Sequence, residues 1–240
     1  MTTATEIRDA AGASGGILRV WNVVLLAVVG GTAAPIALHR HFHGVFNPHQ
    51  MALAFFTWLN AIIALWEICL FLRIDLIEEQ HRRFTAEYRG RELQCARDFF
   101  VKPVPLGRLF SPTLWAELWS TYSIFDDSYA DRKSFGFFVD IGNGFSTLIP
   151  SLLFLYGMTF EIVPARALGI VGLLLFYQTW YGTIVYFASF VMNKRYRGHT
   201  PWNLALFVGM SNGLWLTFPL WGIYAAVVMI ESDSYALFLR

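Results

Sequence analysis

The chain of 240 residues is 56% apolar and only 15% charged. A soluble domain carries about 25% charged residues, so this composition indicates a membrane protein. The formal charge of +1 gives no basic field, which excludes nucleic acid as a partner. Cys69 and Cys95 are the only cysteines, so the sequence supports neither a disulfide framework nor a zinc site.

Five apolar stretches are long enough to cross a bilayer, which takes about 20 residues at helical rise. Residues 1–17 are polar and of mixed charge, unlike the short basic start of a signal peptide, so we expect a tail before a retained first span. The predicted fold is all-α, a polytopic five-transmembrane-helix bundle that forms one membrane domain over residues 18–240. We place its spans near residues 18–38, 51–73, 136–160, 167–192 and 202–230.

The connection 74–135 is the most polar part of the chain. It mixes both charge signs with periodic Leu, Phe and Tyr and breaks at Pro103 and Pro105, which predicts one or two surface or interfacial helices. By the positive-inside rule we expect this connection, the N-terminus and the loop 193–201 to be cytoplasmic, and the C-terminus to lie outside. Together with Arg19 and Arg73, at the adjoining span ends, these three segments hold all but three of the 18 Lys and Arg residues, the exceptions being Arg40, Arg166 and Arg240.

Two carboxyl groups, those of Glu67 and Asp140, lie well inside predicted spans. An ionisable group in the bilayer is costly unless it faces a cavity or a partner, so both indicate a functional site. Helical spacing puts Asn143 on the face of Asp140, and Asn60 on the face of Glu67. The fourth and fifth spans add the polar and aromatic residues Thr179, Thr183, Tyr186, Asn212 and Trp215. These polar faces of four spans predict one shared intramembrane cavity, although Asn and Thr side chains can also serve only to form hydrogen bonds between helices.

Four histidines, His39, His41, His43 and His49, gather in the expected connection between the first two spans. Alternating histidines project to one side only in an extended segment, and no carboxylate lies among them, so we expect no metal site there. We assign them to the membrane interface or to a pH-sensitive edge.

The stretch LWSTYSIFDDSY places Trp119, Tyr122, Asp126 and Tyr129 in the pattern W-x-x-Y-x-x-x-D-x-x-Y. This pattern resembles the signature that opens the catalytic half of the emopamil-binding protein family, EXPERA-domain membrane proteins that include the sterol Δ8-Δ7 isomerases. Asp140 stands where that family has an intramembrane glutamate, and Asn143 where it has a threonine. Two further stretches are similar to its fourth and fifth spans: QTWYGTIVYF, around Tyr181, Gly182 and Tyr186, and MSNGLWLTFP, around Asn212, Leu214, Trp215 and Pro219. The resemblance covers residues 119–224 well, and the first two spans only by topology and by Glu67.

The resemblance implies a bundle that opens sideways into the membrane and holds a flat polycyclic lipid among aromatic side chains. It also implies that an acid protonates a ring double bond, that a tryptophan face stabilises the carbocation, and that a base removes a neighbouring proton, without a cofactor. Asp140 and Glu67 are the expected acid and base, because carboxyl groups in different surroundings can take these two roles, and Trp215 offers the π face. The other expected substrate-binding residues are Asn60, Trp119, Tyr122, Asp126, Asn143, Tyr181, Thr183, Tyr186 and Asn212.

The sequence departs from the family pattern at the site. Ile63 replaces a histidine one turn before Glu67, Thr183 replaces an aspartate, and Asp140 is one methylene shorter than the family's acid. We therefore expect a shifted substrate, a sterol-like or other terpenoid lipid, that is isomerised or cyclised through a cation. The alternative is a non-catalytic sterol- or lipid-binding or trafficking protein of the same fold. The sequence is compatible with a homodimer. The membrane is expected to be that of the endoplasmic reticulum in a eukaryote, or the inner membrane in a bacterium.

Overall fold

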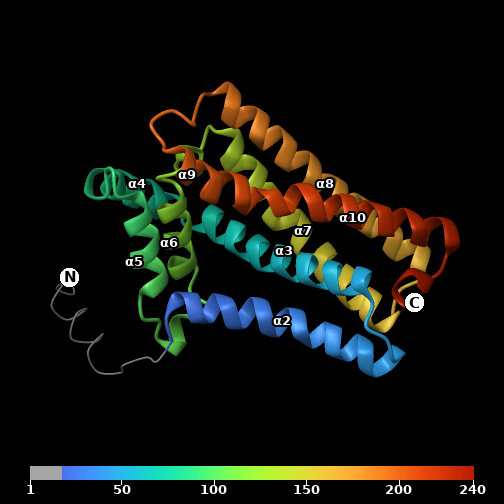
Figure 1. Ribbon diagram of the computed structural model, residues 1–240. Helices are drawn as coiled ribbons and strands as arrows, with labels where there is room; N and C mark the ends of the chain where they lie inside the picture. The colour runs from blue at the N-terminus through green and yellow to red at the C-terminus, as the bar shows by residue number, and fades with distance from the viewer. Residues whose placement is uncertain (1–17) are drawn as a thin grey trace.

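The computed structural model describes residues 18–240, and this part of the chain is helical without a β-strand. Five helical stretches are long and apolar enough to cross a membrane, which confirms the all-α polytopic bundle (Figure 1). The predicted tail, residues 1–17, lies outside the described residues. The five spans are α2 (Val20–His43), α3 (Pro48–Leu72), α7 (Phe135–Phe160), α8 (Ala165–Met192), and a fifth made of α9 (Pro201–Asn203), the π-helical segment η3 (Leu204–Met210) and α10 (Ser211–Ser232).

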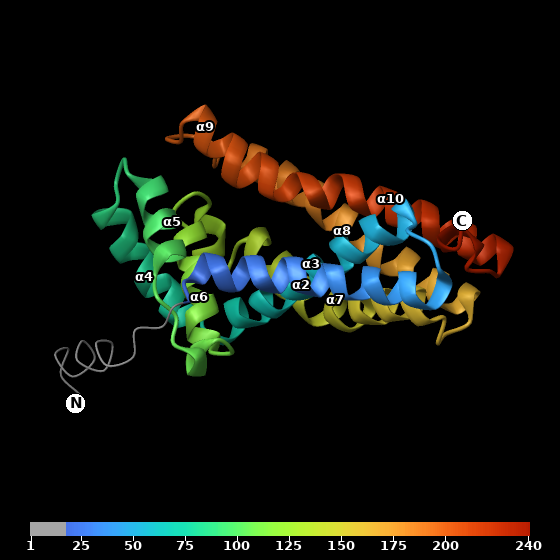
Figure 2. The same ribbon diagram turned by 60° about the horizontal axis from the view of Figure 1, so that its bottom comes forward.

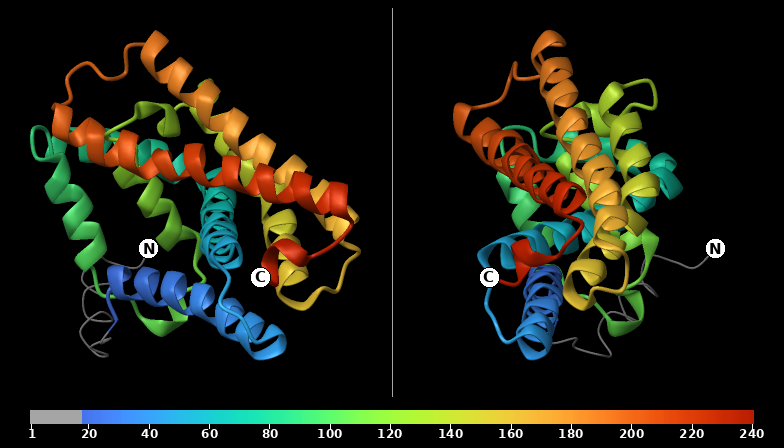
Figure 3. Two further views of the ribbon diagram at one scale, coloured as in Figure 1. Left: turned by 45° about the vertical axis from the view of Figure 1, so that its right-hand side comes forward. Right: turned by 90° about the vertical axis from the view of Figure 1, so that its right-hand side faces the viewer.

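Helix α3 occupies the centre of the bundle, between α2 on one side and α10 on the other (Figure 1, Figure 3). It packs along α7, while α8 packs along both α7 and α10. The fully buried rings of Phe56, Phe154 and Phe176, from α3, α7 and α8, fill the space where these helices meet. By contrast, α2 leaves Leu25 and Leu26 exposed, as expected for a helix that faces lipid.

The connection between the second and third spans forms three helices, more than the one or two predicted. They are α4 (Ile74–Glu87), α5 (Glu92–Val101) and α6 (Pro112–Tyr122), and they gather at one end of the bundle, away from the C-terminus (Figure 2). The third one arises because Pro112 occupies the first turn of α6, where a proline favours a helix start. Helix α6 is also no surface helix, because Ala116 and Trp119 are buried against the bundle.

The histidine-rich stretch was wrongly predicted to be a connection. Helix α2 continues past residue 38 to His43 and ends at Gly44, whose φ of 77° is the left-handed conformation that stops helices. His39 is fully buried in the helix, and His49 already belongs to α3. His43 lies against the end of α7, where its Nε2 is 3.1 Å from the carbonyl oxygen of Thr159. His39 and His43 therefore support helix packing at the end of the bundle opposite α6, whereas His41 is exposed.

Helices α3 and α7 approach closely at Gly144. A Cβ atom added there would lie 2.8 Å from Cβ of Glu67 and 3.0 Å from the carbonyl oxygen of Ala64. This approach is what brings Glu67 next to α7.

Replacing Gly144 with alanine is expected to destabilise the bundle by about 1–3 kcal/mol, because the added methyl group overpacks the α3–α7 contact. The thermal unfolding midpoint in detergent measures this effect. Gly142→Ala is the matched control, since a Cβ atom at that position of the same helix meets nothing within 4 Å. Equal midpoints for the two variants would mean that the close contact at Gly144 does not contribute to stability.

Candidate functional site

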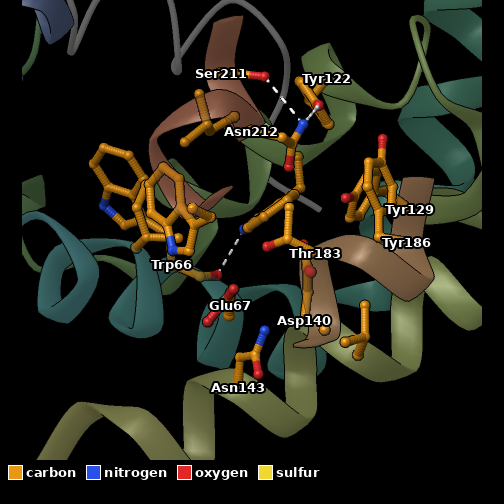
Figure 4. Close-up of a pocket in the computed structure, with 16 residues that line it drawn as sticks. Trp66, Glu67, Tyr122, Tyr129, Asp140, Asn143, Thr183, Tyr186, Ser211 and Asn212 are labelled. Carbon is orange, nitrogen blue, oxygen red and sulfur yellow. Dashed lines mark hydrogen bonds between the residues drawn. The ribbon is translucent and has the colours of Figure 1, made fainter. Parts of the chain in front are cut away.

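A cavity of ≈240 Å³ lies where α3, α7, α8 and α10 meet, at the end of the bundle covered by α6 and η2 (Asp127–Ala130). Most of the predicted site residues line it, from α3, α6, α7, α8 and α10, and Figure 4 shows several of them converging on one space. These residues are Glu67, Trp119, Tyr122, Asp140, Asn143, Thr183, Tyr186, Asn212 and Trp215.

The two carboxyl groups reach the cavity from different helices. Glu67 comes from α3, a little over one turn before that helix ends at Leu72, and Asp140 from the second turn of α7. At 1.5 Å per residue each therefore lies about 8 Å from a helix end, nearer the α6 end than the middle of the bundle. The Glu67 side chain is buried, yet its carboxyl group accepts no hydrogen bond from any residue between 18 and 240. A buried carboxyl group without a protein partner is available to a ligand.

Asn143 stands beside the carboxyl pair, one turn after Asp140 (Figure 4). Its Oδ1 accepts a hydrogen bond from Nε2 of Gln178 on α8 at 3.2 Å. This bond fixes the amide plane and leaves its NH₂ group without a protein acceptor in the described chain. The missing side chain at Gly182 keeps the space in front of this group open, because a Cβ atom there would lie 3.8 Å from Nδ2 of Asn143.

Aromatic side chains form much of the cavity wall, and hydrogen bonds hold them in place. The indole N–H of Trp119 donates to the carbonyl oxygen of Trp66 at 2.7 Å. The Tyr122 hydroxyl donates to the carbonyl oxygen of Phe207 at 2.6 Å and accepts from Nδ2 of Asn212 at 3.3 Å. Phe207 belongs to the π-helical segment η3, and such segments are frequent at functional sites.

The phenols at the α6 end of the cavity are protonated at neutral pH. Burial raises the pKa of Tyr122 to about 12. Burial also raises the pKa of Tyr129 well above its usual value, and the neighbouring Asp140 adds to this effect. The Tyr129 ring packs 5.1 Å from the ring of Trp119, measured between centroids. Tyr129 can therefore act as a neutral hydrogen-bond donor toward a ligand, whereas the Tyr122 hydroxyl already donates to Phe207.

Asp126 does not line the cavity, contrary to the prediction. Its carboxyl group is buried behind the aromatic wall, where it accepts hydrogen bonds from the Tyr186 hydroxyl at 2.8 Å and from the backbone N–H of Ser128 at 3.0 Å. Nη1 of Arg195 lies 3.7 Å from it. The aspartate of the aromatic motif thus positions Tyr186, which does line the cavity, and anchors η2.

Asn60 and Tyr181 also lie outside the cavity, contrary to the prediction. Oδ1 of Asn60 accepts a hydrogen bond from the indole N–H of Trp215 at 2.8 Å, and its Nδ2 donates to the hydroxyl groups of Thr147 and Ser151 on α7. Asn60 thus forms hydrogen bonds between helices, which was the alternative to lining a cavity. Tyr181 is 53% exposed and stacks on Tyr177 on the outer face of α8.

Several cavity residues were not among the predicted site residues. Trp66 directly precedes Glu67, and Tyr129 closes the aromatic motif, so both carried a signal in the sequence. Ser211 adjoins Asn212 and could have been found in the same way. Ile63 and Gly182 carried a signal only through the family resemblance. Leu118 and Val139 carried none, because they resemble any lipid-facing or core residue.

Comparison of this chain with protein-family models, curated proteins and solved structures gives no match. Within residues 18–240, no group of three or more His, Cys, Asp and Glu side chains is arranged to hold a metal ion. The groups of this site that can take part in chemistry include its two carboxyl groups, its amides and its aromatic rings.

Proposed function

We propose that this multi-pass membrane protein is an intramembrane isomerase that shifts a double bond in a sterol-like or other terpenoid lipid. The observation that carries the proposal is that Glu67 and Asp140, from two membrane-spanning helices, line one cavity among aromatic rings. Ionisable groups in such helices are costly and mark functional sites by default. The motif that resembles the emopamil-binding protein family supplies three of these rings, those of Trp119, Tyr122 and Tyr129.

The proposed reaction is a proton addition followed by a proton removal. Asp140 donates its proton to one carbon of a ring double bond, whose electron pair forms the new C–H bond and leaves a carbocation at the other carbon. Glu67 then takes a proton from the neighbouring carbon, and the electrons of that C–H bond form the shifted double bond. Return of the proton from Glu67 to Asp140 resets the site and leaves the lipid's composition unchanged.

The aromatic wall supports the charged intermediate. Asn60 fixes the indole of Trp215 by the bond to its N–H, so the ring stays in one orientation at the cavity. A tryptophan face stabilises a nearby cation, more strongly in a site without water. Tyr122 and Asn212, hydrogen-bonded to each other on the opposite side from the carboxyl groups, suit a lipid hydroxyl group.

The size of the cavity bears on how a lipid would bind. Pockets for drug-sized ligands measure roughly 300–1,000 Å³, so a cavity of ≈240 Å³ suits the reacting ring rather than a whole polycycle. Ser211, at the cavity margin, is exposed on the side of the bundle. We expect the rest of the lipid to extend past this residue into the bilayer.

The alternative function is binding or trafficking of such a lipid without chemistry. The observation in its favour is that Ile63 and Thr183 both line the cavity. The family that the sequence resembles has a histidine and an aspartate at these positions. The Thr183 hydroxyl donates to the carbonyl oxygen of Thr179 in its own helix, so it adds no free acid or base. A cyclisation through the same cation uses the acid alone and remains a variant of the first proposal.

The expected orientation of the protein in the membrane follows from the distribution of its basic residues. We propose that the end of the bundle with α4, α5 and α6 faces the cytoplasm, because it holds most of the Lys and Arg residues. The N-terminus is then cytoplasmic, in the endoplasmic reticulum of a eukaryote or the inner membrane of a bacterium. Cross-linking at low protein concentration tests whether the chain forms a homodimer.

The isomerase proposal is tested by extracting the lipids that co-purify with the protein and incubating them, alongside a Δ8-unsaturated sterol, with fresh protein. The expected result is a new isomer of unchanged mass, detected by chromatography with mass spectrometry. Retention of a lipid that is never converted would favour the binding protein and contradict the isomerase.

Replacing Trp215 with leucine is expected to weaken both lipid retention and turnover, because the change removes the cavity wall and the π face together. A cation–π contact in a dry site contributes about 2 kcal/mol, so turnover should fall roughly tenfold or more. Trp221→Leu is the matched control, since this tryptophan lies on the same helix outside the cavity and donates to His49. If the two variants lose activity equally, Trp215 has no special role.

A further inference from the structure

A second, larger cavity of ≈880 Å³ lies at the α6 end of the bundle. Its walls come from the last turns of α4, the segment 123–127 after α6, and the loop 193–199 that follows α8. Asp126 lies between the two cavities, because it accepts a hydrogen bond from Tyr186 of the first and lies 3.7 Å from Arg195 of the second. None of the candidate site residues lines this second cavity.

Positive charge dominates this cavity. Five permanently charged cations line it against only two carboxylates, Glu92 and Asp127. Asp127 already lies 3.5 Å from Nε of Arg195, and Glu92 accepts a hydrogen bond from the backbone N–H of Gly90 at 2.9 Å. The remaining cations form no ion pair with any residue from 18 to 240, and they are Arg82, Arg89, Lys194 and Arg197.

Arg195 differs from the other cations because carboxylates already balance its charge. Its side chain is only 15% exposed, with Nη1 3.7 Å from the carboxylate of Asp126 and Nε 3.5 Å from that of Asp127. The free positive charge of the cavity therefore comes from the four unpaired cations, which an anion in the cavity could neutralise.

The positive-inside bias explains why basic residues lie at this end, but it does not explain why they surround a hollow. One arginine guanidinium can donate two parallel hydrogen bonds to two oxygens of a phosphate, and several cations around one cavity favour a phosphate-bearing anion. The cavity lies level with the end of the span α8, where the phosphates of a bilayer are found. Phe84 and Tyr88 add apolar surface for the rest of a ligand.

We propose that this basic cavity binds a phosphate-bearing anion, supplied either by a phospholipid headgroup or by a soluble phosphate compound. The site is independent of the proposed isomerase, since it shares no lining residue with the first cavity.

The experiment compares the full chain with a double variant, Arg82→Gln and Arg197→Gln, which removes two unpaired cations. The matched control is Arg83→Gln with Arg108→Gln, which removes the same charge from exposed residues outside the cavity. One arm titrates inorganic pyrophosphate into detergent-solubilised protein by calorimetry at low salt. The other counts phosphatidylglycerol molecules retained from phosphatidylcholine nanodiscs by native mass spectrometry.

We expect saturable binding in at least one arm, weakened about tenfold or more in the double variant and unchanged in the control. Binding of pyrophosphate would identify soluble phosphate as a sufficient ligand. Retention of phosphatidylglycerol alone would identify the headgroup as the source. Binding in neither arm, or equal loss in the double variant and the control, would overturn the proposal.

Discussion

Asp140→Asn is expected to lower turnover by about 10²–10⁴ while lipid retention stays unchanged, because this range is the usual contribution of general acid–base catalysis. Asparagine keeps the size and the hydrogen-bonding capacity of the side chain at the cavity but has no transferable acid proton. Isomer production and lipid retention should be measured side by side on the same preparations.

The control for this variant is Asp233→Asn. Asp233 is exposed at the opposite end of the bundle, and its left-handed φ of 48° suits asparagine well. An Asp140→Asn protein that turns over at the parent rate would remove Asp140 from the mechanism and leave its place in the cavity without a function.

Glu67→Gln is the second variant with a large expected effect. Glu67 is the proposed base, so glutamine should lower turnover by about 10²–10⁴ without loss of lipid binding. If the acid still forms the cation, hydrogen exchange into the lipid can persist although the double bond no longer moves. Deuterium content and isomer yield should therefore be measured together.

Glu79→Gln on α4, an exposed position, is the control for that change. Were both carboxyl variants to alter only the affinity for lipid, with no turnover detectable in the parent protein, the binding function would be the better account.

The number and order of the spans could be predicted because an apolar run of about 20 residues is typical of a helix that crosses a membrane. The end of α2 could not, since His39 and His43 look like a polar connection until the burial of His39 and the contact of His43 with the end of α7 are known. The position of helix α6 could not be predicted from its sequence either. Its composition suits a surface helix, and only the packing of Trp119 against α3 shows that it covers the end of the bundle.

The polar half of the cavity was predictable because polar groups in apolar helices are conspicuous. Helical spacing identifies a face but not its neighbour, which is why Asn60 was assigned to the cavity although it serves Trp215 and α7. The same ambiguity applies to Tyr181, on the outer face of α8. Asp126 shows a further limit, because a sequence motif does not reveal that its acid acts through Tyr186.

The most direct test of the central claim is a single-turnover reaction with protein equilibrated in D₂O. If Asp140 delivers an exchangeable proton to the double bond, the isomer formed should carry one deuterium from the solvent, at the carbon that was protonated. Recovery of bound lipid that is unchanged, or of an isomer without deuterium, would contradict proton addition by the intramembrane acid.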